Sequence, residues 1–219
     1  SCRIFGASGR SVDLFAGIIE LNIFEDMFGT VMSGNILVAD TNNLINLIPI
    51  TGFEYLVFGF RKPSDNISFE RVFRIYKLSN RKKENLQNEV YVINFCSEEL
   101  IVDRSSLVSK TYTGKSIDKI ISDITKQYLK IDSGKFKSDQ LKETFGTYNI
   151  IVPNWHPLDA IRYLSKIATS TTYPSSSFVF FENREGFHFT SIEELTTAEP
   201  IQKITISPRN LGSEKVAQE

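Results

Sequence analysis

Alternation of apolar and polar side chains through the first hundred residues is the feature that most constrains how this chain can fold. Five segments show it, and only short connections separate them. Period-two alternation is typical of strands, and strands joined by short links pair antiparallel, because parallel pairing needs a long crossover. The spacing therefore predicts an antiparallel sheet from residues 16–24, 31–40, 53–61, 69–78 and 89–96.

The alternation also indicates which side chains face the core. In the first of these strands the odd positions, such as Leu21 and Ile23, are small or apolar, whereas Glu20 and Asn22 occupy even positions. Gly34 interrupts the second strand and predicts a bulge or bend there. Five strands without a crossover helix are expected to curl into a small barrel or sandwich.

Helical spacing appears after residue 96. Ser97 is expected to cap a short helix, and Ser116 a longer one whose isoleucines share one face. A further helix is predicted to have His156 as its cap and Pro157 in its first turn. Beyond it, two short strands flank a turn in which Gly186 is expected to take a left-handed conformation.

These patterns predict an α+β protein. We expect an antiparallel β-barrel domain at residues 1–110, followed by a smaller α+β domain at 111–200 with two helices and a β-hairpin. Residues 201–219 hold one candidate strand, Lys203 to Ser207, and are too few to fold alone. Because the chain starts at Ser1 rather than at methionine, we expect a processed or partial chain.

Charge and cysteine content disfavour several functional classes. The 25 Lys and Arg residues balance 26 Asp and Glu residues, so the basic surface of a dedicated DNA-binding protein is missing. No apolar run approaches the roughly 20 residues that cross a bilayer. Cys2 and Cys96 are too few for a disulfide framework and lack the spacing of a zinc site, which favours a reducing compartment.

Two strings resemble parts of catalytic motifs but are incomplete. Gly114-Lys115-Ser116 leads into a helix as a phosphate-binding loop does, yet Ser109 stands where that loop requires glycine. A serine hydrolase elbow needs a preceding strand, which we do not expect before Gly6-Ala7-Ser8-Gly9. We therefore predict neither a nucleotide site nor a hydrolase elbow.

The remaining polar candidates are also isolated. His156 and His188 have no second metal ligand at helical or strand spacing, and His188 is expected to face outward between two phenylalanines. Glu182 and Glu185 form the best local carboxylate pair, at a hairpin tip where acids are commonly solvated. Arg81-Lys82-Lys83 reads as a solvated loop, and Trp155 as packing at a helix entry. No catalytic, cofactor-binding or metal-binding residue, and hence no cofactor, is predicted.

Two longer strings, Glu20 to Gly34 and Val152 to Ile161, resemble the central baseplate hub subunit of contractile-tailed bacteriophages, which is related to the spike base of type VI secretion systems. Shorter matches occur in the order of that family, and His156 departs from its more usual cap residues. Together the matches cover about residues 12–195. The shorter strings are Asp40 to Ile45, Val108 to Lys110 with Tyr112 and Gly114-Lys115, and Phe180 to Phe187.

The resemblance implies a non-enzymatic virion component with a tube-like first barrel and a later second barrel. Residues 201–219 are then either the start of that second barrel, from Lys203, or a C-terminal tail. Such hubs form a homotrimeric, pseudo-sixfold ring that joins the tail tube to the central spike, contacts other baseplate subunits and lets DNA pass without specific binding. The implied location is the tail baseplate, assembled in the host cytoplasm, with no membrane insertion. By alternation, the candidates for lumen or intersubunit contacts are Glu20, Asn22, Arg74 and Lys77.

Two other functions stay open at this point. A tail-associated peptidoglycan hydrolase would use Glu182 and Glu185, or other carboxylates. A spike-base protein of a type VI-like secretion system would share the ring mechanics without the phage context.

Overall fold

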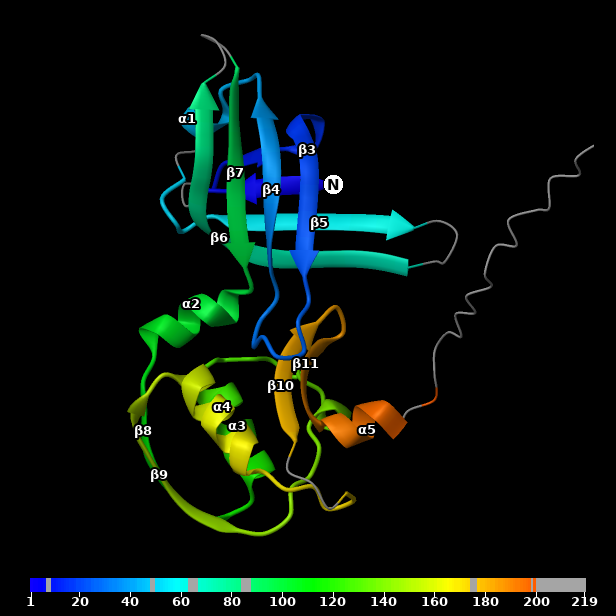
Figure 1. Ribbon diagram of the computed structural model, residues 1–219. Coiled ribbons are helices and arrows are strands. Elements are labelled where there is room, and N and C mark those ends of the chain that lie inside the picture. Colours follow the sequence, from blue (N-terminus) through cyan, green and yellow to red (C-terminus); the bar gives the residue numbers. More distant parts are fainter. Residues whose placement is uncertain are drawn as a thin grey trace, which may run out of the picture.

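The computed structural model describes residues 1–6, 9–47, 50–62, 67–83, 88–173, 177–197 and 199. A curled antiparallel sheet forms one part of the molecule, and helices with two small two-stranded sheets form the other (Figure 1). The predicted α+β class is thereby confirmed. The large sheet contains, in chain order, β1 (Cys2–Phe5), β2 (Ser11–Asp13), β3 (Ile18–Phe24), β4 (Ser33–Asp40), β5 (Tyr55–Lys62), β6 (Ile67–Lys83) and β7 (Glu89–Cys96). Their spatial order across the sheet is β2-β1-β5-β6-β7-β4-β3.

All five predicted strands are present, but the sheet contains more than was predicted. Strands β1 and β2 pair antiparallel across the segment that holds Gly6 and Gly9, so the expectation that no strand precedes that segment is wrong. The sequence pattern did not predict β1, because four residues are too few to show a clear alternation of apolar and polar side chains. Strand β6 also runs on to Lys83, into the predicted polar loop, whose residues 84–87 lie outside the described residues.

The inner face of the sheet carries a core rich in aromatic side chains. The Phe58 ring stacks on Phe73 with 5.2 Å between centroids and meets Phe95 edge-on at 5.5 Å. Such pairs stabilise a core beyond the area that they bury. The same core contains, among others, Ile4, Leu14, Met32, Ile36, Val38, Leu56, Ile75, Tyr91 and Ile93.

Gly34 marks a close approach and not the predicted bulge. It pairs with Ile23 on β3 and Phe95 on β7, where an added Cβ would collide with the Phe95 ring. The bulge lies instead on β3, between Ile18 and Glu20. An extra residue reverses the alternation locally, so Ile19, expected on the inner face, is 59% exposed.

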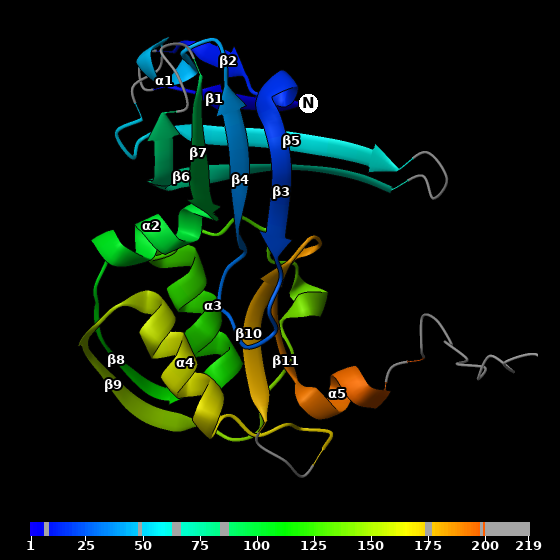
Figure 2. The same cartoon turned by 45° about the horizontal axis from the view of Figure 1, so that its top comes forward.

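The predicted barrel appears in this chain as a curled sheet with two ends. Within the described residues, β2 and β3 at those ends do not pair with each other. Both views show β5 and the first half of β6 leaving the sheet as an arm that projects past β3 (Figures 1 and 2). No described strand pairs with the other edge of β3, and this free edge lies beside the arm.

A second core lies among the helices. The ribbon of β8 (Val108–Lys115) and β9 (Tyr148–Trp155) passes around α3 (Ile117–Gln127) and α4 (Pro157–Ile167), as Figure 2 shows. The hairpin of β10 (Phe178–Asn183) and β11 (Gly186–Ser191) packs beside α4. The remaining elements are α1 (Leu44–Leu47), α2 (Glu98–Ser105), α5 (Ile192–Thr197) and the short 3-10 turns η1 (Phe15–Gly17) and η2 (Ser138–Gln140).

The predicted helix starts are confirmed, although the capping chemistry differs. Ser97, Ser116 and His156 occupy the cap positions of α2, α3 and α4, but none makes a side-chain cap bond. Instead, the Asp103 carboxylate of α2 accepts a 2.7 Å hydrogen bond from the Leu158 N–H at the start of α4. This second core contains, among others, Val108, Tyr112, Ile117, Ile120, Ile121, Ile124, Leu158, Ile161, Leu164, Phe187 and Phe189.

Strand β8 and helix α5 were not predicted. The β8–β9 ribbon tolerates Pro153 within β9, because each strand of a two-stranded ribbon has one free edge where a missing N–H breaks no ladder bond. Among the described helices, none is long and apolar enough to cross a membrane. The candidate strand at Lys203 to Ser207 lies outside the described residues.

The turn of the β10–β11 hairpin gives the first testable prediction. Gly186 has φ +130°, and a Cβ there would collide with the backbone carbonyl of Lys135. Gly114 has φ +61° with open space around a Cβ. Gly186→Ala should therefore lower the free energy of unfolding by about 2 kcal/mol or more, and Gly114→Ala by about 1 kcal/mol. Urea denaturation measures both, and equal losses would contradict the close approach.

Candidate functional site

The junction between the sheet and the hairpin is built around Glu182 at the end of β10. Its side chain is 2% exposed, and its Oε2 accepts a 2.9 Å hydrogen bond from the Met32 N–H. Arg71 Nη1 lies 3.6 Å from its Oε1, and the Ser97 hydroxyl donates to the Met32 carbonyl oxygen at 3.4 Å. The buried acid thus joins β10 to β6 and to Met32, the residue that precedes β4, and Ser97 joins the start of α2 to the same residue.

Further polar contacts surround this carboxylate. Arg71 Nη2 donates to the backbone carbonyls of Asn183 at 3.2 Å and Arg184 at 2.8 Å. The Arg184 N–H in turn donates to Glu25 in the β3–β4 connection at 2.8 Å. Contacts from both sides hold the hairpin turn, so its position relative to the sheet is fixed by charge-assisted bonds.

This arrangement separates the two carboxylates that the sequence paired as hydrolase candidates. Glu182 is committed to the junction, and burial raises its pKa above the ordinary value. Glu185 lies in the turn and lines a surface cavity that Glu182 does not line. The two acids therefore do not flank a shared cleft, as hydrolysis of a glycosidic bond requires.

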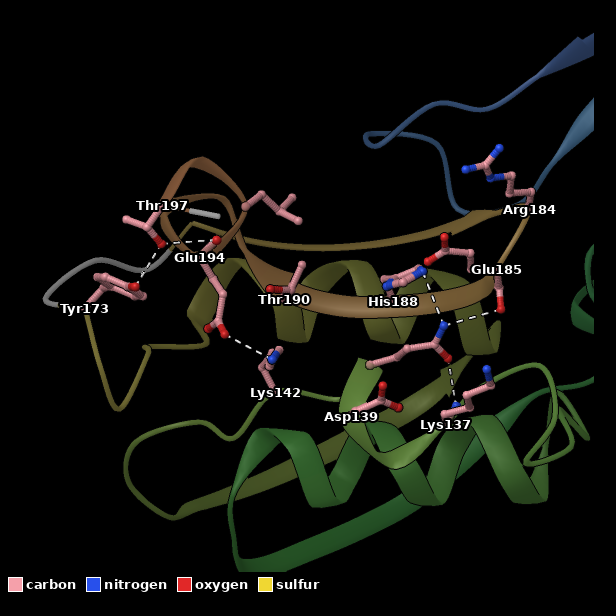
Figure 3. Close-up of a pocket in the computed structure, with 12 residues that line it drawn as sticks. Lys137, Asp139, Lys142, Tyr173, Arg184, Glu185, His188, Thr190, Glu194 and Thr197 are labelled. Atoms are coloured by element: carbon pink, nitrogen blue, oxygen red, sulfur yellow. Dashed lines mark hydrogen bonds and ion pairs between the residues drawn. The ribbon is translucent and has the colours of Figure 1, made fainter. Parts of the chain in front are cut away.

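The cavity at the hairpin has a volume of about 780 Å³ and is open to solvent on one side. Strand β11 forms its floor, and η2, the hairpin turn and α5 form its walls (Figure 3). Sequence reasoning missed it, because its walls come from segments far apart in the chain. Its lining residues are Lys137, Asp139, Gln140, Lys142, Tyr173, Arg184, Glu185, His188, Thr190, Glu194, Leu195 and Thr197.

His188 alternates with buried Phe187 and Phe189, as predicted, but it faces this cavity. Its ring stacks on Phe181 with 5.2 Å between centroids, and its Nε2 lies 3.0 Å from Asn183 Oδ1. Burial lowers the pKa of His188 below the ordinary value of 6.5, and nearby Glu185 and Asp139 oppose that shift. The imidazole is therefore neutral at pH 7.

The outer face of the sheet carries the predicted polar positions, with one correction. Asn22 Nδ2 donates across the strands to Asn35 Oδ1 at 3.0 Å, and Asn94 Nδ2 on β7 donates to Ser79 Oγ at 2.9 Å. Glu20 and Lys77 share this face and are exposed. A row of polar side chains thus crosses β3, β4, β7 and β6 on the side away from the core.

Arg74 was predicted to be available for contacts outside the chain, which is wrong. It is 8% exposed, and its guanidinium carbon lies 4.2 Å from the centre of the Tyr55 ring. A cation over an aromatic face is stabilised by the ring quadrupole. Alternation identified its side of the strand but could not reveal that Tyr55 covers it.

The free edge of the sheet is apolar. Ile19 and Phe24 on β3 are both more than half exposed, and so are Phe15 just before β3 and Phe28 just after it. An unpaired edge strand bordered by large apolar side chains favours association with another chain.

The other predicted candidates remain separate from the cavity. Trp155 and Tyr163 meet edge-on at 5.2 Å and line a shallow pocket of about 400 Å³ beside α4. Cys2 and Cys96 are free thiols, and burial raises their pKa values to about 11 and about 12. Among the described residues, no three His, Cys, Asp or Glu side chains are grouped as metal ligands.

The junction predicts different outcomes for the same change at Glu182 and at Glu185. Glu182→Ala leaves the buried Met32 N–H and Arg71 without their acceptor, so it should lower the free energy of unfolding by about 1 to 3 kcal/mol. Glu185→Ala, in the exposed turn, should change it by less than about 0.5 kcal/mol. Equal effects would show that the junction does not hold the two parts together.

Glu182→Gln tests the electrostatic part of the junction. Because burial raises the pKa of Glu182 above 4.5, the folded protein binds this proton more tightly than the unfolded chain does. This carboxyl therefore favours the folded state most below pH 4.5, and that contribution is lost as pH rises through the higher folded pKa. Glu182→Gln should flatten this part of the stability profile, measured by urea unfolding from pH 4 to 8, and an unchanged profile would contradict the raised pKa.

Comparison with known proteins finds a similar fold in solved tail proteins. No family model and no curated protein sequence matches the chain. Among solved structures, a tail protein from Neisseria meningitidis MC58 aligns with a TM-score of 0.53 and 9% identity over 86% of this chain and 49% of that one. The 43 kDa tail protein of prophage MuSo2 from Shewanella oneidensis aligns with a TM-score of 0.53 and 8% identity over 87% of this chain and 55% of that one.

A third similar structure is the E. coli c3393 protein, a type VI secretion system component with structural similarity to T4 bacteriophage tail proteins gp27 and gp5. It aligns with a TM-score of 0.49 and 12% identity over 78% of this chain and 46% of that one. The chain spans about half the length of each of these structures. At this level of identity the likeness shows the fold alone, which this chain shares with these two tail proteins.

Proposed function

We propose that this chain is a structural, non-enzymatic subunit of a phage tail baseplate hub. In this proposal, three copies form a ring that joins the tail tube to the central spike, contacts other baseplate subunits and lets DNA pass. The fold shared with two tail proteins supports the tail context. The observation that carries the proposal is the free apolar edge of β3, which gives the ring a surface for assembly.

Pairing at this edge would close the sheet between copies. An edge strand offers unpaired N–H and C=O groups, and natural monomers protect such edges with charges, prolines or covering segments. Within β3, Glu20 is the one charged residue, and exposed Ile19 and Phe24 flank it. The projecting β5–β6 arm lies on the same side of the sheet, where it would reach a neighbouring copy (Figure 2).

The polar outer face would line the passage through the ring. Asn22, Asn35 and Asn94 are neutral hydrogen-bonding groups, while Glu20 and Lys77 have opposite charges. A strongly basic wall would retain DNA through its phosphates, because phosphate contacts dominate DNA affinity. A wall of nearly balanced charge supports passage without retention.

The domain division belongs to the same proposal. Residues 1–110 would form the tube-like barrel and residues 111–200 the α+β elaboration, supported by the two separate cores. A second barrel that starts near Lys203 would give three copies six barrels in the ring.

Ile19→Asp tests the assembly surface. The full-length protein should sediment at about three times its monomer mass. A charge on the free edge should shift the variant to the monomer without changing its thermal unfolding. Ile151→Asp is the matched control, because Ile151 on β9 is 70% exposed and lies on the helical part.

Analytical ultracentrifugation measures both variants. Assembly lost with Ile19→Asp and kept with Ile151→Asp would support pairing at β3. A wild-type protein that remains monomeric at high concentration, or an Ile19→Asp variant that assembles normally, would refute the proposed ring contact.

A further inference from the structure

The cavity beside β11 has a lining suited to a polar ligand. Small-molecule sites of similar size are usually lined mainly by apolar and aromatic side chains. Here most lining residues are polar or charged, and Figure 3 shows them spread along β11, from the hairpin turn and η2 at one end to α5 at the other. Leu195 and Tyr173 are its main apolar contributors.

The charges of this lining cancel. Three basic side chains, Lys137, Lys142 and Arg184, face three acidic ones, Asp139, Glu185 and Glu194. The Lys142 ammonium and the Glu194 carboxylate already pair at 3.0 Å. A strongly anionic or cationic ligand would gain little from such a balanced site, because each attraction is offset by a repulsion.

Hydrogen bonds fix the orientation of two amide side chains beside His188. Asn183 Oδ1 accepts the Glu185 N–H at 2.8 Å, and Gln140 Oε1 accepts the Lys137 N–H at 2.8 Å. Gln140 is 8% exposed, so its amide is held in place at the base of the cavity. Fixed donors and acceptors of this kind give a site orientational specificity.

Two contacts bear on the tautomer of His188. Its Nε2 lies 3.0 Å from Asn183 Oδ1, an acceptor, and 3.4 Å from Gln140 Nε2, a donor, and the shorter contact favours the tautomer with the hydrogen on Nε2. In the neutral ring Nδ1 then keeps a lone pair, and no described residue donates to it. In that tautomer His188 Nδ1 is an acceptor at a cavity that Asp139 and Glu185 also line.

We propose that this cavity binds a neutral carbohydrate. Each sugar hydroxyl both donates and accepts, so a sugar can use His188 Nδ1 and the carboxylates as acceptors while Lys137 and Arg184 act as donors. Tyr173, at the opposite end of the cavity from His188 in Figure 3, provides an aromatic ring for the less polar face of a sugar. The site lies within one chain and does not require ring assembly.

A glycan panel and nuclear magnetic resonance test this site. The full-length protein is first screened against immobilised neutral and acidic glycans, and the neutral glycan that binds best is titrated into protein with labelled histidine. The chain has only two histidines. His156 Nδ1 lies 3.0 Å from the Asp103 carbonyl oxygen, away from the cavity, so its imidazole signals serve as an internal control.

The expected result is a shift of the His188 imidazole signals with those of His156 unchanged. Asp139→Asn should weaken binding about tenfold or more, the effect of losing one charge-assisted hydrogen bond. Asp159→Asn, the same change at an exposed position on α4, should leave binding intact. The His156 signals also report whether each variant is folded.

Three outcomes would overturn the proposal. The first is that no neutral glycan of the panel binds. The second is that a neutral glycan binds without shifting the His188 imidazole signals. The third is that the Asp139→Asn and Asp159→Asn variants bind the glycan with equal affinity. Preferential binding of an acidic glycan, or of the dipeptide Ala-Glu added as a zwitterionic probe, would also count against a neutral sugar.

Discussion

The buried carboxylate of Glu182 connects elements that are 150 residues apart in the chain. Its bond to the Met32 N–H holds the β10–β11 hairpin against the start of β4, and Arg71 holds the turn of the same hairpin. A buried charge is tolerated only when it is paired and hydrogen-bonded, so its partners have to stay in place. The orientation of the cavity relative to the free edge of the sheet depends on this contact.

Two surfaces of the sheet have opposite chemical character. The bulge between Ile18 and Glu20 turns Ile19 outward, and this makes the edge apolar while the adjacent face carries asparagines. This division suits the proposed ring, in which the edge of the sheet would bind a neighbouring copy and the polar outer face would stay wetted. One extra residue in β3 thus exposes an apolar side chain that simple alternation places in the core.

Local patterns predicted the strands and helix starts well, and contacts between distant segments account for the failures. Alternation located the strands, and cap residues located α3 and α4, because both signals lie within a few neighbouring positions. The burial of Arg74 under Tyr55, the close approach of Gly34 to Phe95 and the role of Glu182 depend on residues far away in the sequence. The cavity around His188 was missed for the same reason.

The most direct test of the account is a cryo-electron microscopy reconstruction of the particle that contains this protein. We expect the chain in a ring between tail tube and spike, with Ile19 covered by a neighbouring copy and Asn22, Asn35 and Asn94 facing the channel. Isolated copies outside the channel, or a ring whose lumen is lined by α3 and α4, would contradict the account.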